Sequence, residues 1–352
     1  MLSILFTALL YFHAAGYSLA AEEACPADFA ALVKQPIYTV TEHLVSLPDG
    51  RKVFYRYTKG NDPEKTIVAL NGLIYPDAAW NTYIQQMRAK GYSIVQIFYS
   101  GHPESLLQQP KGISGAFLDS PLTPGKLSEE VSAVLLDAKI EKPVHLLTLS
   151  YGAVGVEFAK QNPEKVRDLT MMAPLVVSLD KYNPDAQAFN NAMQGSKAMA
   201  SLFDPFNLFG AKSSIEAMGN NLYRDAVDKM ISAGIEKGRK PPAGLDPDLY
   251  KRGILSLVMG AKDFDLKTYA RDALPKINLM LASKEDPPAL LQDQLAFWEM
   301  LPTAQKGAMV MLNGGEHAMA GANPHASALV TDNLWSGKLA SGSYTVDADA
   351  KP

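Results

Sequence analysis

The sequence predicts an α/β protein with a mostly parallel β-sheet that is covered by helices on both faces. Short runs such as Thr66–Leu70 and Val144–Leu149 are almost entirely apolar, which is typical of strands buried on both sides. These runs alternate with segments of helical periodicity, and that alternation is the pattern of a parallel sheet. A long helix-rich stretch, 176–271, interrupts the alternation and predicts an insertion outside the sheet.

Composition limits the class of protein. The chain has 352 residues, 47% hydrophobic and 20% charged, so it can bury the core of one large domain or two small ones. This content excludes an intrinsically disordered chain, and no internal repeat is present. The net charge is −4 and no basic patch stands out, which argues against a nucleic-acid partner. Cys25 is the only cysteine, so no internal disulfide can form.

The N-terminus has the pattern of a secretory signal peptide. Leu2–Phe12 is apolar, Ser18-Leu19-Ala20 supplies small residues at a cleavage site, and charge first appears at Glu22. The segment departs from the pattern because it has no Lys or Arg before the apolar run. The alternatives are a membrane anchor or a buried N-terminal helix, and the run is shorter than the ~20 apolar residues that a bilayer requires. We therefore expect export to the periplasm or the medium after cleavage near Ala20, with no stable membrane span afterwards.

A hairpin is predicted first, with strands Glu42–Leu47 and Lys52–Tyr57 around the turn Pro48-Asp49-Gly50. The alternation of strands and helices follows. The predicted strands are Thr66–Leu70, Tyr92–Tyr99, Val144–Leu149, Val166–Ala173, Ile277–Ala282 and Ala308–Leu312; the predicted helices are Ala78–Lys90, Leu127–Ile140, Tyr151–Gln161, Leu290–Met300 and Ala326–Trp335. In the second of these helices, Ser128 is the expected N-cap and Glu130 lies in the first turn.

The insertion, 176–271, has no strand-like run. Its predicted helices are Ala186–Leu202, Ser213–Met230 and Leu249–Met259, and prolines separate them. Because such helices cannot enter the sheet, we expect them to form a lid. Residues 341–352 are expected to form a loose C-terminal tail.

The motif that carries chemistry is Thr148-Leu149-Ser150-Tyr151-Gly152-Ala153, between an apolar strand and a helix. A nucleophilic serine at such a sharp turn needs small residues two positions away, and Gly152 meets this requirement. Thr148 is larger than the Gly usually found on the other side. The alternative is that Ser150 only caps the following helix.

The surroundings of this motif resemble the α/β-hydrolase superfamily, in its serine-hydrolase branch with a helical cap. The similar segments are Lys142–Leu147, Phe158–Arg167, Ser100–Ser105 (similar to the family's R-G-H-G-x-S loop) and Asn71-Gly72 (similar to its His-Gly). The likeness covers roughly residues 40–175 and 272–335. It departs from the pattern at Ser100, Pro103 and Asn71, which replace Arg, Gly and His.

The resemblance implies a mostly parallel, eight-stranded α/β-hydrolase sheet with a helical cap. The implied division is a signal peptide at 1–20, a core at 21–175 and 272–340, a cap at 176–271 and a tail at 341–352. The family's order is nucleophile, acid, histidine. This order implies Ser150, then Asp286 in the loop after strand Ile277–Ala282, then His317 after strand Ala308–Leu312.

Alternatives remain for the acid and the base. Glu285 is the fallback for Asp286, and Asp180 is a less favoured acid. His325 competes with His317, although we expect it to precede or cap the final helix. The other four histidines have structural interpretations: His13 in the signal, His43 in the hairpin, His102 in a loop and His145 in a buried strand.

In the implied mechanism, His317 deprotonates Ser150, Asp286 orients the imidazole, and water hydrolyses the acyl-enzyme. The family's geometry puts the oxyanion-hole N–H groups at Tyr151 and at Leu73, which follows Asn71-Gly72. No metal or cofactor is implied, because the sequence has no metal-ligand spacing and no G-x-G-x-x-G after a strand.

The first expectation is therefore a carboxylesterase acting on a small-molecule acyl substrate. A proline-iminopeptidase-like aminopeptidase shares the same catalytic groups but would need an acidic residue in the lid to hold a free amine. Its candidates are Asp180, Asp185, Glu216, Asp225 and Asp228. A non-catalytic binding protein on a hydrolase scaffold is the third possibility, and the departures at Thr148 and Asn71 leave it open.

Overall fold

The computed structural model describes most of the chain between residues 39 and 349. The residues that it does not describe are 1–38, 63, 74–79, 110–114, 178–194, 197, 200, 202–203, 205–210, 237–240, 263, 270–273, 284–288 and 350–352. The predicted signal segment and Cys25 therefore lie outside the described residues. Within the described part, no helix combines the length and apolar character needed to cross a membrane.

The described strands form one sheet of nine in the order β1-β2-β4-β3-β5-β6-β7-β8-β9. Pairing is antiparallel between β1 and β2 and between β2 and β4, and parallel at the other contacts. The strands are β1 Val40–Ser46, β2 Lys52–Thr58, β3 Thr66–Leu70, β4 Ser93–Phe98, β5 Val144–Leu149, β6 Val166–Met172, β7 Lys276–Ala282, β8 Lys306–Asn313 and β9 Gly342–Asp347.

The α-helices are α3 Asn81–Ala89, α4 Pro103–Leu107, α5 Pro124–Asp137, α6 Ala153–Gln161, α8 Ala211–Glu236, α9 Pro247–Gly260, α10 Leu291–Met300, α11 Met319–Ala322 and α12 Pro324–Trp335. The short 3₁₀ helices are η2 Ala116–Asp119, η3 Pro163–Lys165, η5 Leu266–Tyr269 and η6 Thr303–Gln305. The mostly parallel α/β class is confirmed, and so are the hairpin and the alternating strands and helices, with small shifts in their bounds.

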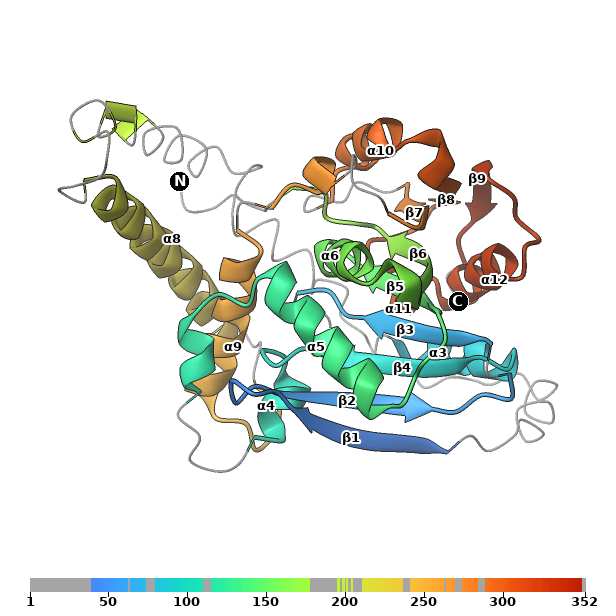
Figure 1. Ribbon diagram of the computed structural model, residues 1–352, viewed down its shortest axis with the longest axis horizontal. Helices are drawn as coiled ribbons and strands as arrows, with labels where there is room; N and C mark the ends of the chain where they lie inside the picture. The colour runs from blue at the N-terminus through green and yellow to red at the C-terminus, as the bar shows by residue number, and fades with distance from the viewer. Residues whose placement is uncertain are drawn as a thin grey trace.

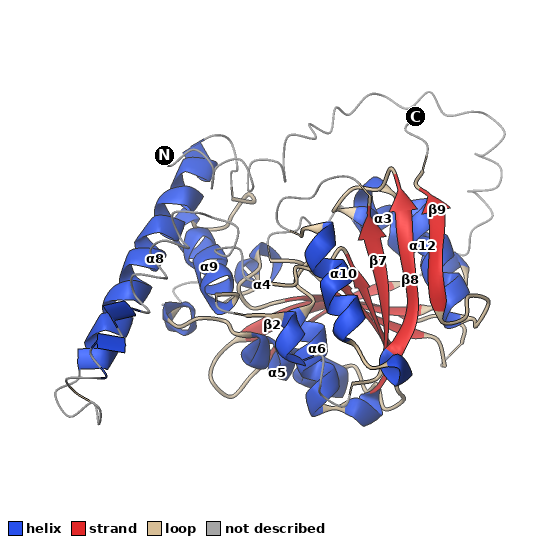
Figure 2. Ribbon diagram, turned by 90° about the horizontal axis from the view of Figure 1, so that it is seen from above, coloured by secondary structure: helices blue, strands red, loops and turns tan. Residues whose placement is uncertain are grey.

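Helices cover both faces of the sheet (Figures 1 and 2). On one face α5, α6 and α10 contribute side chains to the larger hydrophobic core, and on the other α3, α11 and α12 contribute to a second one. Strand β5 contributes side chains to both cores: Leu146 belongs to the first, and Leu147 and Leu149 belong to the second. This two-sided burial explains why the central strands lack the alternating polar pattern of a half-exposed strand.

The C-terminal segment corrects one expectation. Gly342–Asp347 is not a loose tail but strand β9, which pairs in parallel with β8 and makes the sheet nine-stranded rather than eight-stranded. Tyr344 and Val346 pack against the second core, while Ser343 and Thr345 are exposed. This alternation is the pattern of an edge strand with one buried face.

Helix α5 also begins earlier than predicted. It starts at Pro124, and the side chain of Thr123 accepts a hydrogen bond from the Lys126 N–H at 3.4 Å. Ser128 is therefore not the N-cap; its hydroxyl donates to Gln161 of α6. Proline is well suited to the first helical position because its missing N–H has no partner there in any case.

The insertion between β6 and β7 contains α8 and α9, as the helical pattern predicts, while 186–202 lies largely outside the described residues. Figure 2 shows α8 and α9 side by side, with α8 farther from the sheet. Leu257 of α9 belongs to the larger core, whereas Val227 and Ile231 of α8 pack only into a small cluster with α9. Helix α9 thus connects α8 to the body of the protein.

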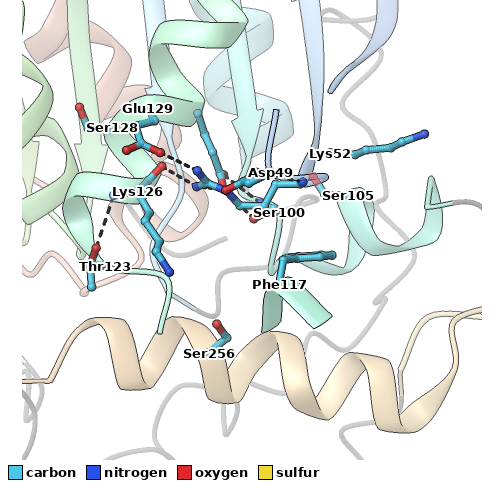
Figure 3. A network of polar contacts seen from close by, with 12 residues as sticks. Asp49, Lys52, Ser100, Ser105, Phe117, Thr123, Lys126, Ser128, Glu129 and Ser256 are labelled. Atoms are coloured by element: carbon cyan, nitrogen blue, oxygen red, sulfur yellow. Dashed lines mark hydrogen bonds and ion pairs between the residues drawn. The ribbon is translucent and has the colours of Figure 1, made fainter. Parts of the chain in front are cut away.

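A buried guanidinium links the β1–β2 hairpin to α5. Arg51, 3% exposed, pairs with Asp49 at 2.7 Å, Glu129 at 2.6 Å and Glu130 at 3.1 Å. Glu130 in turn accepts hydrogen bonds from the N–H and the hydroxyl of Ser100, at 3.0 and 2.6 Å. Figure 3 shows Asp49, Glu129 and Ser100 around this network. Complete burial raises the pKa of Glu130 to about 7, although the contacts with Ser100 and Arg51 lower it.

Replacing Glu130 tests how much its burial changes the free energy of unfolding as the pH is varied. Between pH 4.5 and 7 an unfolded Glu130 has lost its proton while the folded one still holds it, so its contribution to stability falls as the pH rises. We expect the free energy of unfolding of the wild type, relative to Glu130→Gln, to fall by roughly 1–3 kcal/mol across this range. Urea unfolding at several pH values measures the difference.

Glu129→Gln is the matched control, because it removes an exposed carboxylate from the same guanidinium and leaves the buried one in place. A difference between wild type and Glu130→Gln that stays constant, or grows with pH, would contradict the assignment.

Candidate active site

Ser150 occupies a strained turn between β5 and α6. Its φ is +62°, a left-handed conformation that is uncommon for residues other than glycine. The backbone holds it there, because the Ser150 N–H donates to the Met172 carbonyl at 2.9 Å and the Leu175 N–H donates to the Ser150 carbonyl at 2.6 Å. Strain of this kind persists only where the surroundings enforce it, and it is concentrated at functional sites.

Thr148, the residue that departs from the elbow pattern, is accommodated by Gly155 in α6. A Cβ atom on Gly155 would collide with Thr148 Cγ2, and one on Gly152 would lie 3.5 Å from Thr148 Oγ1. The threonine therefore fills space that Gly155 leaves open, whereas an added Cβ on Gly152 would collide with the side chain of Met171. The small residue that is usual at position 148 in the strand is thus replaced by a small residue in the helix, Gly155.

The end of β3 approaches Ser150 closely. A Cβ atom on Gly72 would lie 3.2 Å from Ser150 Cβ, 3.8 Å from Ser150 Oγ and 3.2 Å from the Leu149 carbonyl oxygen. The structure thus brings the Gly72-Leu73 segment beside Ser150. Asn71, which stands where the resembled family has His, is 1% exposed and donates through its side chain to the Ile97 carbonyl at 3.1 Å.

Tyr151 follows Ser150 directly and is fully buried, with its ring edge-on to Phe264 at 5.4 Å between centroids. Its N–H donates to the Leu149 carbonyl at 2.7 Å, which closes a three-residue turn around Ser150. The predicted oxyanion donor thus directly follows Ser150, and its N–H is bonded within the turn itself.

His317 lies in the loop between β8 and α11, where its Nε2 atom is shielded from solvent. Gly314 in the preceding turn has φ +79°, a conformation that glycine adopts without strain. The Gly314 N–H donates to the hydroxyl of Ser283 at 2.7 Å, so this loop is bonded to the residue that follows β7. Both Ser150 and His317 follow the carboxyl ends of parallel strands and hence the same edge of the sheet.

The acid candidates Asp286, Glu285 and Asp180 all lie outside the described residues. His325, the alternative base, is an exposed residue in the first turn of α12, where its N–H donates to Asp349 at 2.9 Å. His43 is in β1, and His145 in β5 pairs with Asp168 at 2.7 Å and stacks on Trp335. These positions fit the structural interpretations.

His102 is the site residue that sequence reasoning did not single out. It is 3% exposed and its Nε2 lies 3.1 Å from the Gly72 carbonyl oxygen, directly beside the turn at Ser150. The sequence signal was the Ser100–Ser105 segment itself, whose likeness to a family loop suggested no role for the imidazole.

Among the residues that the structure describes, no group of three or more His, Cys, Asp or Glu side chains could hold a metal ion. No protein-family model matches the sequence, and a search of curated proteins found no similar one.

Comparison of the fold with solved structures gives matches over most of the chain. A hydrolase from Pseudomonas aeruginosa PA01 aligns with TM-score 0.55 and 16% identity, covering 84% of this chain and 98% of its own. The enol-lactonase from Burkholderia xenovorans LB400 has the same TM-score and identity and covers 84% and 100%. An esterase from Thermogutta terrifontis has TM-score 0.53 and 12% identity and covers 85% and 98%.

The chain has the α/β-hydrolase fold. The sharp turn between β5 and α6 corresponds to the place where this fold carries its nucleophile elbow. Ser150, with its positive φ, lies in this turn.

The exchange of small residues at the elbow is testable by a double-mutant cycle. Gly155→Ala places a methyl group against Thr148 Cγ2, so we expect it to lower the free energy of unfolding by about 1–3 kcal/mol. Thr148→Ser removes Cγ2 alone, and the double variant should regain a large part of the loss. Urea unfolding of the four proteins gives the coupling energy. Strictly additive effects would show that the two residues do not share this space.

Proposed function

We propose that the protein is a serine hydrolase that cleaves a carboxylic ester through an acyl-enzyme on Ser150. The observation that carries this proposal is the left-handed turn at Ser150 with the Gly72-Leu73 segment packed against it. A serine that only capped a helix would need neither the positive φ nor the close approach of a second strand end. In this arrangement an acyl carbon could meet Ser150 Oγ while its oxygen faces backbone N–H groups.

His317 would take the proton from Ser150 as the hydroxyl attacks, and would return it to the leaving alcohol. In the strand order, β6 and β7 separate β5 from β8, so the strand ends are roughly 14 Å apart at ~4.8 Å per strand. The loop after β8 has to bend toward Ser150 to close that gap. The glycine turn at Gly314 and the short helix α11 support such a path.

Asp286 would orient the imidazole and stabilise its cation. The support for this role is the hydrogen bond between the Gly314 N–H and Ser283 Oγ, which ties the loop after β7 to the loop after β8. Asp286 follows Ser283 closely in the sequence, so its carboxylate would need only a short reach to meet His317.

The oxyanion would be bound by the N–H groups of Leu73 and Tyr151. Leu73 is 7% exposed and directly follows Gly72, where an added Cβ would lie 3.2 Å from Ser150 Cβ. The Tyr151 N–H already donates to Leu149, so the developing oxyanion would have to share or displace that bond. This makes Leu73 the donor with the larger expected effect on rate.

Solved structures with this fold support ester over peptide cleavage. The enol-lactonase and the Thermogutta terrifontis esterase have names that refer to carboxylic esters, since a lactone is a cyclic ester. An aminopeptidase would need an acidic residue free to bind an amine. Of the candidate acids, Asp228 is paired with Lys251 at 2.8 Å, and Asp180, Asp185 and the side chain of Glu216 lie outside the described residues. Asp225 is exposed on α8 and stays a candidate.

Labelling with a fluorophosphonate tests the nucleophile. We expect one covalent adduct per wild-type chain, located on Ser150 by peptide mass spectrometry, because an activated serine attacks the phosphorus atom. Ser150→Ala should give no adduct. The matched control is Ser132→Ala, since Ser132 lies in α5 and donates to the Ser128 carbonyl.

Two histidine variants complete the labelling test. His317→Gln should slow labelling by at least about 1,000-fold because it removes the general base. His325→Gln should label at the wild-type rate. An unlabelled wild type would favour the non-catalytic binding protein, and loss of labelling in His325→Gln but not in His317→Gln would reverse the assignment of the base.

A substrate panel separates the ester from the peptide hypothesis. We expect turnover of p-nitrophenyl esters of rising chain length and at least about 100-fold lower kcat/KM for aminoacyl anilides, because the ester hypothesis assigns no carboxylate to hold a free amine. Hydrolysis of the anilides alone would overturn the esterase assignment.

A further inference from the structure

We propose that His102 is a positioning residue that orients the Gly72–Leu73 peptide unit, so that the Leu73 N–H points at the site of the oxyanion. This inference rests on the proposed function, because it assigns a role within the same reaction. Its basis is the pair of hydrogen bonds that the imidazole makes with the backbone.

The two ring nitrogens have distinct partners. The Tyr99 N–H lies 3.1 Å from His102 Nδ1, and an N–H group can only donate, so Nδ1 is the acceptor. In a neutral imidazole the proton is then on Nε2, which lies 3.1 Å from the Gly72 carbonyl oxygen and donates to it. The Tyr99 backbone thus selects the tautomer that can hold Gly72.

The Gly72 carbonyl and the Leu73 N–H belong to one peptide group. A trans peptide is planar and its C=O and N–H point in opposite directions, so fixing one fixes the other. By holding the carbonyl on one side, His102 directs the Leu73 N–H to the other side. The hydrogen bond also polarises the amide, which makes its N–H a stronger donor.

The position of Gly72 shows why this orientation matters. Its Cα is close enough to Ser150 that an added Cβ would lie 3.8 Å from Oγ. A rotation of the Gly72–Leu73 peptide would therefore move the N–H away from the atom that reacts. Donors aimed before the reaction are what stabilise a tetrahedral oxyanion.

The loop that carries His102 is itself fixed. The His102 N–H donates to the Tyr99 carbonyl at 2.7 Å, and the Leu106 N–H donates to the His102 carbonyl at 3.0 Å. Ser100 is bonded to Glu130 through two hydrogen bonds, and Gly101 packs against Gly253 of α9 so closely that neither position can hold a Cβ atom without a shift. The imidazole is therefore held rigidly from behind.

The imidazole of His102 stays neutral at the near-neutral pH at which an esterase would work. Burial lowers the pKa of His102 to about 4, although backbone hydrogen bonds at Gly72 and Leu73 raise it. Protonation of Nδ1 would also set two donors against each other, at His102 and Tyr99. His102 thus differs from His317, whose proposed role requires it to accept and release a proton.

The test compares His102→Phe with His102→Gln. Phenylalanine keeps a ring in the space but makes no hydrogen bond, so we expect kcat for a p-nitrophenyl ester to fall about 10- to 100-fold with KM within about twofold. Affinity for a boronic acid, which mimics the tetrahedral state, should fall by a similar factor. Glutamine can donate through its amide nitrogen and should recover at least about half of the loss on a logarithmic scale.

His145→Phe is the matched control. His145 is also buried, at 2% exposed, but it pairs with Asp168 and stacks on Trp335 away from the turn. We expect this variant to lose stability while kcat stays within about twofold. If the role of His102 is purely structural, His102→Phe and His145→Phe will both lose stability and both keep the wild-type kcat. That result would overturn the proposal.

Nitrogen-15 NMR of the wild type provides a readout that does not depend on turnover. The Nε2–H tautomer of His102, with a coupling across the hydrogen bond to the Gly72 carbonyl carbon, is the expected result. An Nδ1–H tautomer overturns the inference even if Ser150 is labelled. A wild type that neither reacts with a fluorophosphonate nor hydrolyses esters overturns the proposed function, and with it any role of His102 in catalysis.

Discussion

The close approach of three backbone segments at Ser150 is the constraint on which the rest of the site depends. Strand β5 turns into α6 through a residue with φ +62°, and the end of β3 lies against the same turn. There is no room for a Cβ atom on Gly155 and little on Gly72. Positions of the small residues, rather than one fixed pentapeptide, therefore decide whether the turn can form, and this is why Thr148 is tolerated.

The parallel part of the sheet could be predicted because its strands are buried on both faces and its helices have amphipathic periodicity. Two features at the margins could not. Strand β9 has only one buried face, and its short Tyr344-Thr345-Val346 alternation is a much weaker signal than an apolar run. The start of α5 depends on Thr123 and Pro124, which lie before the periodic pattern begins. The periodicity alone therefore places the first residue of the helix too late.

Within the candidate site, the sharp turn at Ser150 could be predicted, because a strand–turn–helix junction of this kind requires small side chains near the turn. His102 was not, because both its partners are main-chain atoms, the Tyr99 N–H and the Gly72 carbonyl, which every sequence contains. The compensation of Thr148 by Gly155 was hidden for a related reason. This compensation depends on which face of α6 packs against β5, and that packing cannot be deduced from the sequence.

The buried contact between Arg51 and Glu130 is connected to the same site through Ser100. Burying Arg51 and Glu130 costs several kcal/mol of solvation, and an apolar pair of similar volume would often be at least as stable. Glu130, however, holds both the N–H and the hydroxyl of Ser100, two residues before His102. An apolar replacement could hold neither. The carboxyl oxygens of Glu130 therefore fix the loop that carries His102, and we propose that His102 in turn orients the peptide beside Ser150. A costly interaction between the hairpin and α5 would thus serve the precision of a turn on another strand.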